Sequence, residues 1–240
     1  MSKAIYTILK NALREKVMFH NFADKSIDIA CKALSAKQAI GNPEHDDYPI
    51  IRGKEVMIEA DFLSSKGQSF TDEFENNSYR IKDLLDMDLP SNRERASFIA
   101  GFNAVYKHLG LIDKTIHCKD SEPVLCADKL PAIIKKDTKV LLIGHHPRFL
   151  EKLALFCKVR AIDLNPENIG KIFSGTTIEP EENTQDAIGW CDMIFATGST
   201  IVNNSISTFI NADKPAIFFG VTITGPAIAL NLKTFCQYGH

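Results

Sequence analysis

Hydrophobic residues follow different periods in the two halves of the chain. Between residues 55 and 62, apolar side chains alternate with polar ones, which is the period of two expected for a half-buried antiparallel strand. A weaker alternation over residues 24–36 predicts a second strand. Residues 66–68 predict a turn, and residues 71–79 a polar loop.

A long helix is predicted to complete the first half. Ser91 follows a proline and can accept a hydrogen bond from the first free amides, and Glu94 completes a capping box. Apolar residues at 98, 102, 105 and 109 form one stripe, and Gly110 can adopt the left-handed conformation that ends helices. We therefore expect an α+β domain over residues 1–115.

From residue 138 the pattern changes to short apolar runs separated by helical segments. The run at 139–144 is apolar almost throughout, which is typical of a parallel strand covered on both faces. Pro147 can open the next helix, over 148–157. Further strands are predicted at 159–164, 192–196 and 215–219. The strand at 192–196 is followed by a predicted helix through Ile210. This alternation predicts a Rossmann-like parallel sheet over 138–240, which residues 116–137 join to the first half as a linker or surface segment.

Small and polar residues follow each predicted strand of the second half. Ligands bind beyond the carboxyl ends of parallel strands, so the loops starting at Gly144, Asp163, Thr197 and Gly220 are expected to meet there. In the loop Thr197, Gly198, Ser199 and Thr200, hydroxyls and amides at a helix N-terminus can bind an anion, or a hydroxyl can simply cap the helix. Asn203 can reach the same pocket.

Two adjacent histidines follow the first of these strands. His145 and His146 can ligate a metal, exchange protons near neutral pH or cap the next helix. Because neighbouring side chains point apart, we expect at most one to face the cleft.

Ordinary NAD binding is not expected. A dinucleotide fingerprint needs three spaced glycines, whereas only Gly144 is present and Pro147 lacks an amide donor. Asp163 could still hold ribose hydroxyls.

The cysteines form no local zinc motif. Six are spread along the chain without a Cys-x-x-Cys, so we interpret them as reduced thiols of a cytoplasmic protein, most of them packed in the core. The adjacent pair His117-Cys118 could join a metal site assembled in space, and so could Cys236.

Charge and hydropathy exclude two classes of partner. The chain has 28 Lys and Arg against 30 Asp and Glu, a net charge of −2, which argues against nucleic acid. The uncharged stretches at 193–212 and 215–232 are polar or interrupted by glycine and proline, which argues against a membrane span. The sequence leaves open whether the chain forms a homo-oligomer and whether it turns over a substrate.

Several segments together resemble the heavy-metal chelation family, a domain family of unknown function. They are VLLIGHHPR at 140–148, FATGSTIVNN at 195–204, FGVT at 219–222, FIAGFNAV at 98–105 and GQSFTD at 67–72. The resemblance covers nearly the whole chain, although His146 stands where an apolar or aromatic residue is expected.

This resemblance implies an α/β fold that joins an N-terminal domain like that of enolase to the Rossmann-like domain, with a cleft between them that binds heavy metal. Transferred by position, the cleft candidates are His145, Pro147, Arg148, Thr197 through Thr200, Asn203, Gly220 and Thr222.

Two hypotheses follow. In the first, the cleft binds a metal, or a metal-containing or anionic small molecule, with a role in chelation or cofactor handling. His145, Cys118 and Cys236 would then suit a divalent transition metal, because imidazole and thiolate are borderline or soft ligands. In the second, the protein is a small-molecule enzyme that uses a nucleotide or methyl-donor cofactor, with Asp163 on the ribose.

Overall fold

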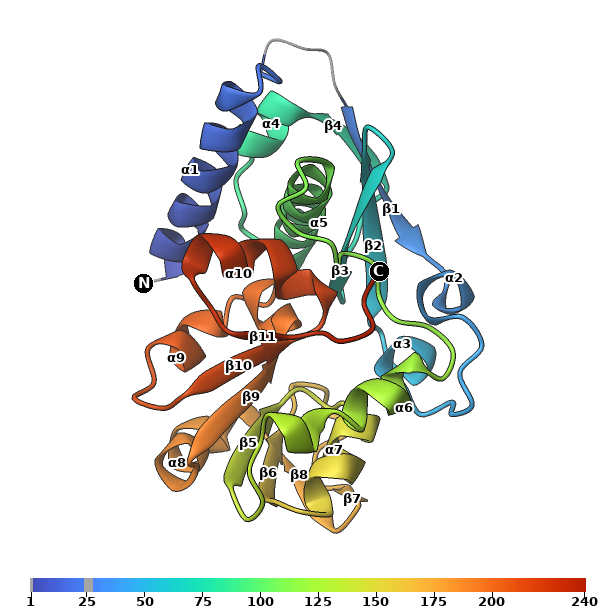
Figure 1. Ribbon diagram of the computed structural model, residues 1–240, viewed down its shortest axis with the longest axis vertical. Helices are drawn as coiled ribbons and strands as arrows, with labels where there is room; N and C mark the ends of the chain where they lie inside the picture. Colours follow the sequence, from blue (N-terminus) through green and yellow to red (C-terminus); the bar gives the residue numbers. More distant parts are fainter. Residues whose placement is uncertain (1, 24–27) are drawn as a thin grey trace.

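The computed structural model describes residues 2–23 and 28–240 and contains two sheets (Figure 1). Within these residues the first sheet has four antiparallel strands in the order β3-β2-β1-β4. Their bounds are β1 Asp28–Leu34, β2 Val56–Phe62, β3 Ser65–Thr71 and β4 Asn77–Arg80. The strand predicted over 24–36 is confirmed over 28–34, whereas Ser35 caps α2 and Ala36 begins that helix, and residues 24–27 lie outside the described residues. The polar loop predicted over 71–79 is wrong at its end, because β4 begins at Asn77 and pairs with β1.

Helices cover both faces of this sheet. The predicted helix is α5 (Asn92–His108), and the Ser91 side chain caps it by accepting from the Arg93 amide. Glu94 bonds to the Ser91 hydroxyl, and not to the backbone amide of a full capping box. The remaining helices of this half are α1 Ser2–Phe19, α2 Ala36–Ile40, α3 Pro49–Arg52 and α4 Ile81–Asp86.

The predicted exposed face of β2 is buried. Met57 is inaccessible to solvent because it packs with side chains around α2, and Glu59 is 6% exposed. Glu59 accepts a hydrogen bond from Gln68 at 2.9 Å and pairs with Lys66 at 3.0 Å. The half-buried strand was therefore a wrong prediction, since the polar positions of β2 are satisfied inside the protein.

The predicted turn at 66–68 is also wrong. The β2–β3 hairpin turns at Leu63 and Ser64, which both have positive φ, and Gly67 lies within β3. A Cβ on Gly67 would lie 2.2 Å from the Ala104 amide nitrogen in α5. Glycine is therefore required here by the close approach of a helix and not by a turn.

The second sheet has seven strands among the described residues, in the order β11-β10-β9-β5-β6-β8-β7. All its pairings are parallel except that of β7 with β8. The strand bounds are β5 Lys139–Ile143, β6 Lys158–Ile162, β7 Ile172–Phe173, β8 Thr176–Glu179, β9 Met193–Thr197, β10 Ala216–Phe219 and β11 Thr234–Phe235. The predicted Rossmann-like parallel sheet is confirmed. The chain reverses direction across the sheet between β5 and β9, which is the crevice where such folds bind ligands.

Short helices connect these strands. The α-helices are α6 Glu122–Ala127, α7 Pro147–Ala154, α8 Thr184–Trp190, α9 Ile206–Ile210 and α10 Thr224–Leu230. The 3-10 turns are η1 Leu130–Ala132, η2 Glu181–Asn183, η3 Gly198–Ile201 and η4 Val221–Ile223. The helix predicted to run from the Thr197 loop through Ile210 is interrupted, because η3 ends at Ile201 and Asn204 has a positive φ before α9.

The two sheets share packing contacts. Helix α10 lies against α1 and α5 (Figure 1), and one core cluster contains buried side chains from both halves. The segment predicted as a linker carries α6, and the backbone at Thr115 and Ile116 bonds to His240 at the end of the chain. Within residues 2–23 and 28–240, no helix is both long and apolar enough to cross a membrane.

Candidate functional site

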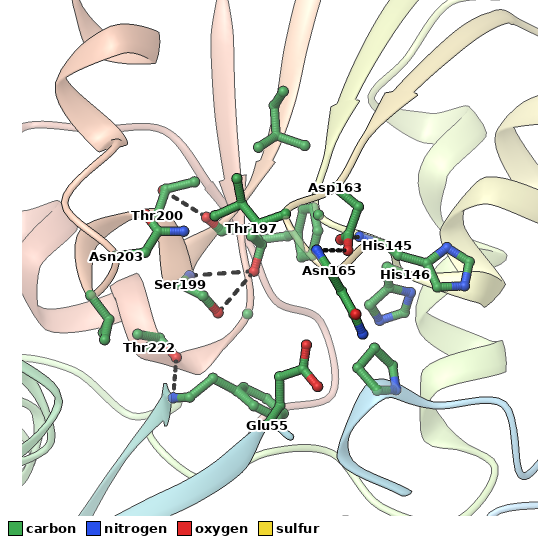
Figure 2. A pocket seen from close by; sticks show the side chains of 18 of the residues that line it. Glu55, His145, His146, Asp163, Asn165, Thr197, Ser199, Thr200, Asn203 and Thr222 are labelled. Atoms are coloured by element: carbon green, nitrogen blue, oxygen red, sulfur yellow. Dashed lines mark hydrogen bonds between the residues drawn. The ribbon is translucent and has the colours of Figure 1, made fainter. Parts of the chain in front are cut away.

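A cavity of about 730 Å³ lies where the carboxyl ends of the parallel strands face the first sheet (Figure 2). Loops after β5, β6, β9 and β10 form one wall, so the four predicted loops do meet. Residues 48–55 and 70–72 contribute from the first half. The segment 117–126 and Cys236 form a further part of the wall.

Two of these loops touch at the reversal point of the sheet. Gly144 has φ +86°, and a Cβ there would lie 2.7 Å from the Thr197 Cγ2 atom. Glycine therefore allows the loop after β5 to pass against the end of β9.

Asp163 organises the loops after β5 and β6. Its Oδ2 accepts from the His145 amide at 2.6 Å, and its Oδ1 accepts from the Asn165 amide at 2.8 Å and the Asn168 side chain at 3.1 Å. Asp163 lines the cavity, but both carboxylate oxygens already fix the backbone.

The loop from Thr197 to Thr200 is held by its own hydroxyls. Thr197 Oγ1 accepts from the Ser199 amide at 3.3 Å, and the Thr200 hydroxyl donates to the Thr197 carbonyl at 2.8 Å. Thr197, Ser199 and Thr200 line the cavity, whereas Gly198 packs against Ile223 outside the lining. Because η3 is a single turn, a helix dipole adds little to anion binding here.

The remaining polar candidates also make bonds within the fold. Asn203 Oδ1 accepts from the Ser205 amide at 3.1 Å. Thr222 Oγ1 accepts from the Phe70 amide at 3.1 Å and so ties η4 to β3. Both side chains line the cavity, as does Gly220 with φ +89°.

Arg148 does not line the cavity. Its side chain is 5% exposed, and its guanidinium pairs with Asp47 at 2.6 Å and Glu151 at 2.9 Å. It also lies over the Tyr48 ring, 5.9 Å from the centroid. These contacts give Arg148 a structural role in holding the segment before α3.

His145 and His146 differ in whether a ring nitrogen has a free lone pair. His146 Nδ1 accepts from the Phe149 amide at 3.3 Å and caps α7, and its ring stacks on Phe149. Burial lowers the pKa of His146 to about 3, so the ring is neutral and its proton sits on Nε2. In this state His146 has no lone pair to give a metal. His145 Nδ1, in contrast, is buried and has no hydrogen-bond partner among the described residues.

One end of the cavity is rich in sulfur and imidazole. Cys118 and Cys126 come from the segment 117–126 and Cys236 from the end of the chain, and all three line the cavity with His117. Burial raises the pKa of each thiol, that of Cys236 to about 11, so these thiols are protonated at neutral pH.

The Nε2 atom of His117 is available to bind a metal. Its Nδ1 lies 2.6 Å from the Cys118 carbonyl, which places the proton on Nδ1 and leaves the Nε2 lone pair free. Burial lowers the pKa of His117, which favours the neutral ring that a metal requires.

These donors suit a soft metal in kind but do not form a closed cage. Among residues 2–23 and 28–240, no three side chains of His, Cys, Asp or Glu lie close enough together to hold an ion.

Glu55 and Cys126 were missed as candidates from the sequence. Glu55 precedes β2, and its carboxyl points into the cavity (Figure 2). Its Oε2 is buried without a hydrogen-bond partner among the described residues, and burial raises its pKa. Alternation along β2 assigns Glu55 to a solvent face, so no local pattern identifies it. The His117-Cys118 pair was the one usable signal for that end of the cavity.

Residues 129–240 match the model of the family DUF364, whose description reads "Putative heavy-metal chelation". The chain is similar to the crystal structure of a protein of unknown function from the DUF364 family of Pyrococcus horikoshii. The TM-score is 0.57 and the identity 14%, over 91% of this chain and 79% of that chain. A DUF364 protein of unknown function from Desulfitobacterium hafniense gives a TM-score of 0.49 and 13% identity, over 73% and 72% of the two chains. No curated protein matches the chain.

The family resemblance seen in the sequence is confirmed by this match, which covers residues 129–240. The match to the Pyrococcus horikoshii structure confirms the mixed α/β fold class. The family description suggests heavy-metal chelation, while both related structures are of proteins with unknown function.

Proposed function

We propose that this protein binds a metal-bearing small molecule in the cavity between its two sheets. The observation that carries the proposal is the gathering of three thiols and the free Nε2 of His117 on one wall. The DUF364 description supports a heavy metal. We keep the division into domains at 1–115 and 138–240, and the cleft between them, as part of this proposal.

The size of the cavity favours a small molecule over a bare ion. Pockets for small ligands typically enclose roughly 300–1,000 Å³, and this cavity has about 730 Å³. The missing closed cage supports the same conclusion, because a chelated metal arrives with part of its coordination already filled.

The donor set favours a soft or borderline divalent metal. Thiolate and imidazole bind such ions better than magnesium or calcium. Since burial keeps the thiols protonated, binding would release protons, as metal sites with cysteine ligands do. Of the sequence-based candidates, Cys118, Cys236 and His145 stay proposed ligands. His146 is replaced by His117, because capping of α7 occupies its lone pair.

Cadmium binding tests the proposal. Titration of Cd²⁺ into reduced, anaerobic protein should produce the ultraviolet absorbance of thiolate–cadmium bonds. Cys118→Ser and Cys236→Ser should each weaken binding at least tenfold, about 1.4 kcal/mol, as should His117→Ala and His145→Ala. Cys157→Ser is the matched control, because Cys157 does not line the cavity.

Two outcomes would contradict the proposal. If the wild-type protein shows no thiolate–cadmium absorbance, it does not bind the metal through its thiols. If Cys157→Ser weakens binding as much as the cavity variants do, the metal does not bind in this cavity. The nucleotide-enzyme hypothesis has no comparable support, since Asp163 already holds two loops.

A further inference from the structure

Four polar side chains of the cavity lining have oxygens that already accept hydrogen bonds within the fold, and we call them the donor wall: Asn165, Ser199, Asn203 and Thr222. Asn165 Oδ1 accepts from the Glu167 amide at 3.0 Å, and Asn203 Oδ1 accepts from the Ser205 amide at 3.1 Å. Because both partners are backbone N–H groups, these bonds fix which side of each amide is oxygen. The NH₂ group of each asparagine is then left over.

The hydroxyls of this wall follow the same rule. Ser199 Oγ accepts from the Thr197 hydroxyl at 3.2 Å (Figure 2), and Thr222 Oγ1 accepts from the Phe70 amide. Within the described part of the chain, no acceptor takes a hydrogen from Ser199, Thr222 or the two asparagine amides. These four side chains therefore offer the cavity unused hydrogen-bond donors.

Carboxyl groups also line the cavity, at Glu55, Asp72, Asp163, Glu167, Glu181 and Glu182. Asp163 directs both oxygens to donors of the fold. Glu55 lies against Gly53, where an added Cβ would be 2.0 Å from Oε2, and no described cation pairs with it. Burial, with Asp163, Asp72 and Glu167 nearby, raises the pKa of Glu55.

We infer that the ligand is a polycarboxylate chelator, which presents carboxylate oxygens to the donors of Asn165, Asn203, Ser199 and Thr222 while its metal faces the sulfur end. A ligand rich in acceptors matches a wall of unused donors, since each buried polar group left unpaired costs binding energy. The donors are neutral, which suits carboxylates whose charge the metal has partly cancelled. This inference rests on the proposed function and adds the chemical class of the organic part.

Citrate and iminodiacetate are suitable probes. Each is titrated calorimetrically into the full-length protein, with and without prior loading with Cd²⁺. At least one probe should bind the loaded protein, at least tenfold more tightly than the free protein. The double variant Asn165→Asp/Asn203→Asp keeps both Oδ1 acceptors but removes both NH₂ donors. It should weaken probe binding at least thirtyfold and leave the affinity for Cd²⁺ alone unchanged.

The control is Asn77→Asp. Asn77 Oδ1 accepts from the Ser78 amide at 2.8 Å, so the change is chemically the same, but Asn77 lies in β4 outside the cavity. This variant should bind the probes as the wild type does. Unfolding curves establish that each variant is folded.

The outcomes separate this inference from the proposed function. If Cd²⁺ does not bind, the proposed metal is wrong. The donor wall would still be supported if citrate binds the metal-free protein and the double variant abolishes that binding. Probes that bind neither form, or bind the double variant as well as the wild type, overturn the polycarboxylate.

Discussion

Asn103 in α5 should be among the most stabilising polar side chains of this protein. It is fully buried, its Nδ2 group lies 3.0–3.2 Å from the carbonyl oxygens of Gln68, Val221 and Thr222, and its Oδ1 accepts from the Gly225 amide at 2.9 Å. These bonds join α5 to β3 and to the segment after β10. Asn103→Ala removes about three hydrogen bonds worth roughly 1–1.5 kcal/mol each, so we expect a loss of about 3–5 kcal/mol.

Urea unfolding followed by circular dichroism measures this loss. Asn77→Ala is the control, because Asn77 is exposed and should change the free energy of unfolding by less than about 0.5 kcal/mol. Asn103→Asp separates the two sides of the amide, since it keeps Oδ1 but cannot donate to the carbonyls. A loss below about 1 kcal/mol for Asn103→Ala would refute the assignment of a structural role to these bonds.

Three further predictions concern single residues. Burial raises the pKa of Glu55 above 4.5 in the folded state, so the contribution of Glu55 to stability is lost as pH rises. Glu55→Gln should therefore be more stable than the wild type at pH 8 and equally stable below pH 4.5. Urea unfolding at the two pH values measures this difference. Gly67→Ala should destabilise by at least about 1–3 kcal/mol, measured by thermal unfolding, because its Cβ would lie 2.2 Å from the Ala104 amide nitrogen. Burial would raise the pKa of Glu94, but hydrogen bonds from Ser91 and a neighbouring arginine lower it to about 2. Glu94→Gln should therefore lower the stability above pH 4.5 and change it little near pH 2, which acid titration would detect.

The parallel sheet was predictable because the composition of its strands reflects their burial. Residues 139–143 are buried along most of their length, and a strand covered on both faces must be apolar on both. The strand-end rule then located the loops at Gly144, Asp163, Thr197 and Gly220, all of which line one cavity.

The first half was predicted less well, because tertiary contacts override the local pattern there. Alternation in β2 implies a solvent face, yet Glu59 is buried with Gln68 and Lys66 as partners. Gly67 has the composition of a turn, but its small size serves the approach of α5. Gln68 and Lys66 meet Glu59 because the β2–β3 hairpin pairs the two strands, and α5, which approaches Gly67, is distant in sequence.

The same reasoning explains which parts of the site escaped prediction. A parallel sheet fixes where its own loops end, so one wall follows from topology. The other wall depends on where a second sheet and the segment 116–137 are placed, and this placement brings Glu55 and Cys126 to the cavity. It also depends on single hydrogen bonds: one bond takes the lone pair of His146, and another frees the Nε2 of His117. Residue type alone ranks these two histidines equally as metal ligands, and only the partner of each Nδ1 atom separates them.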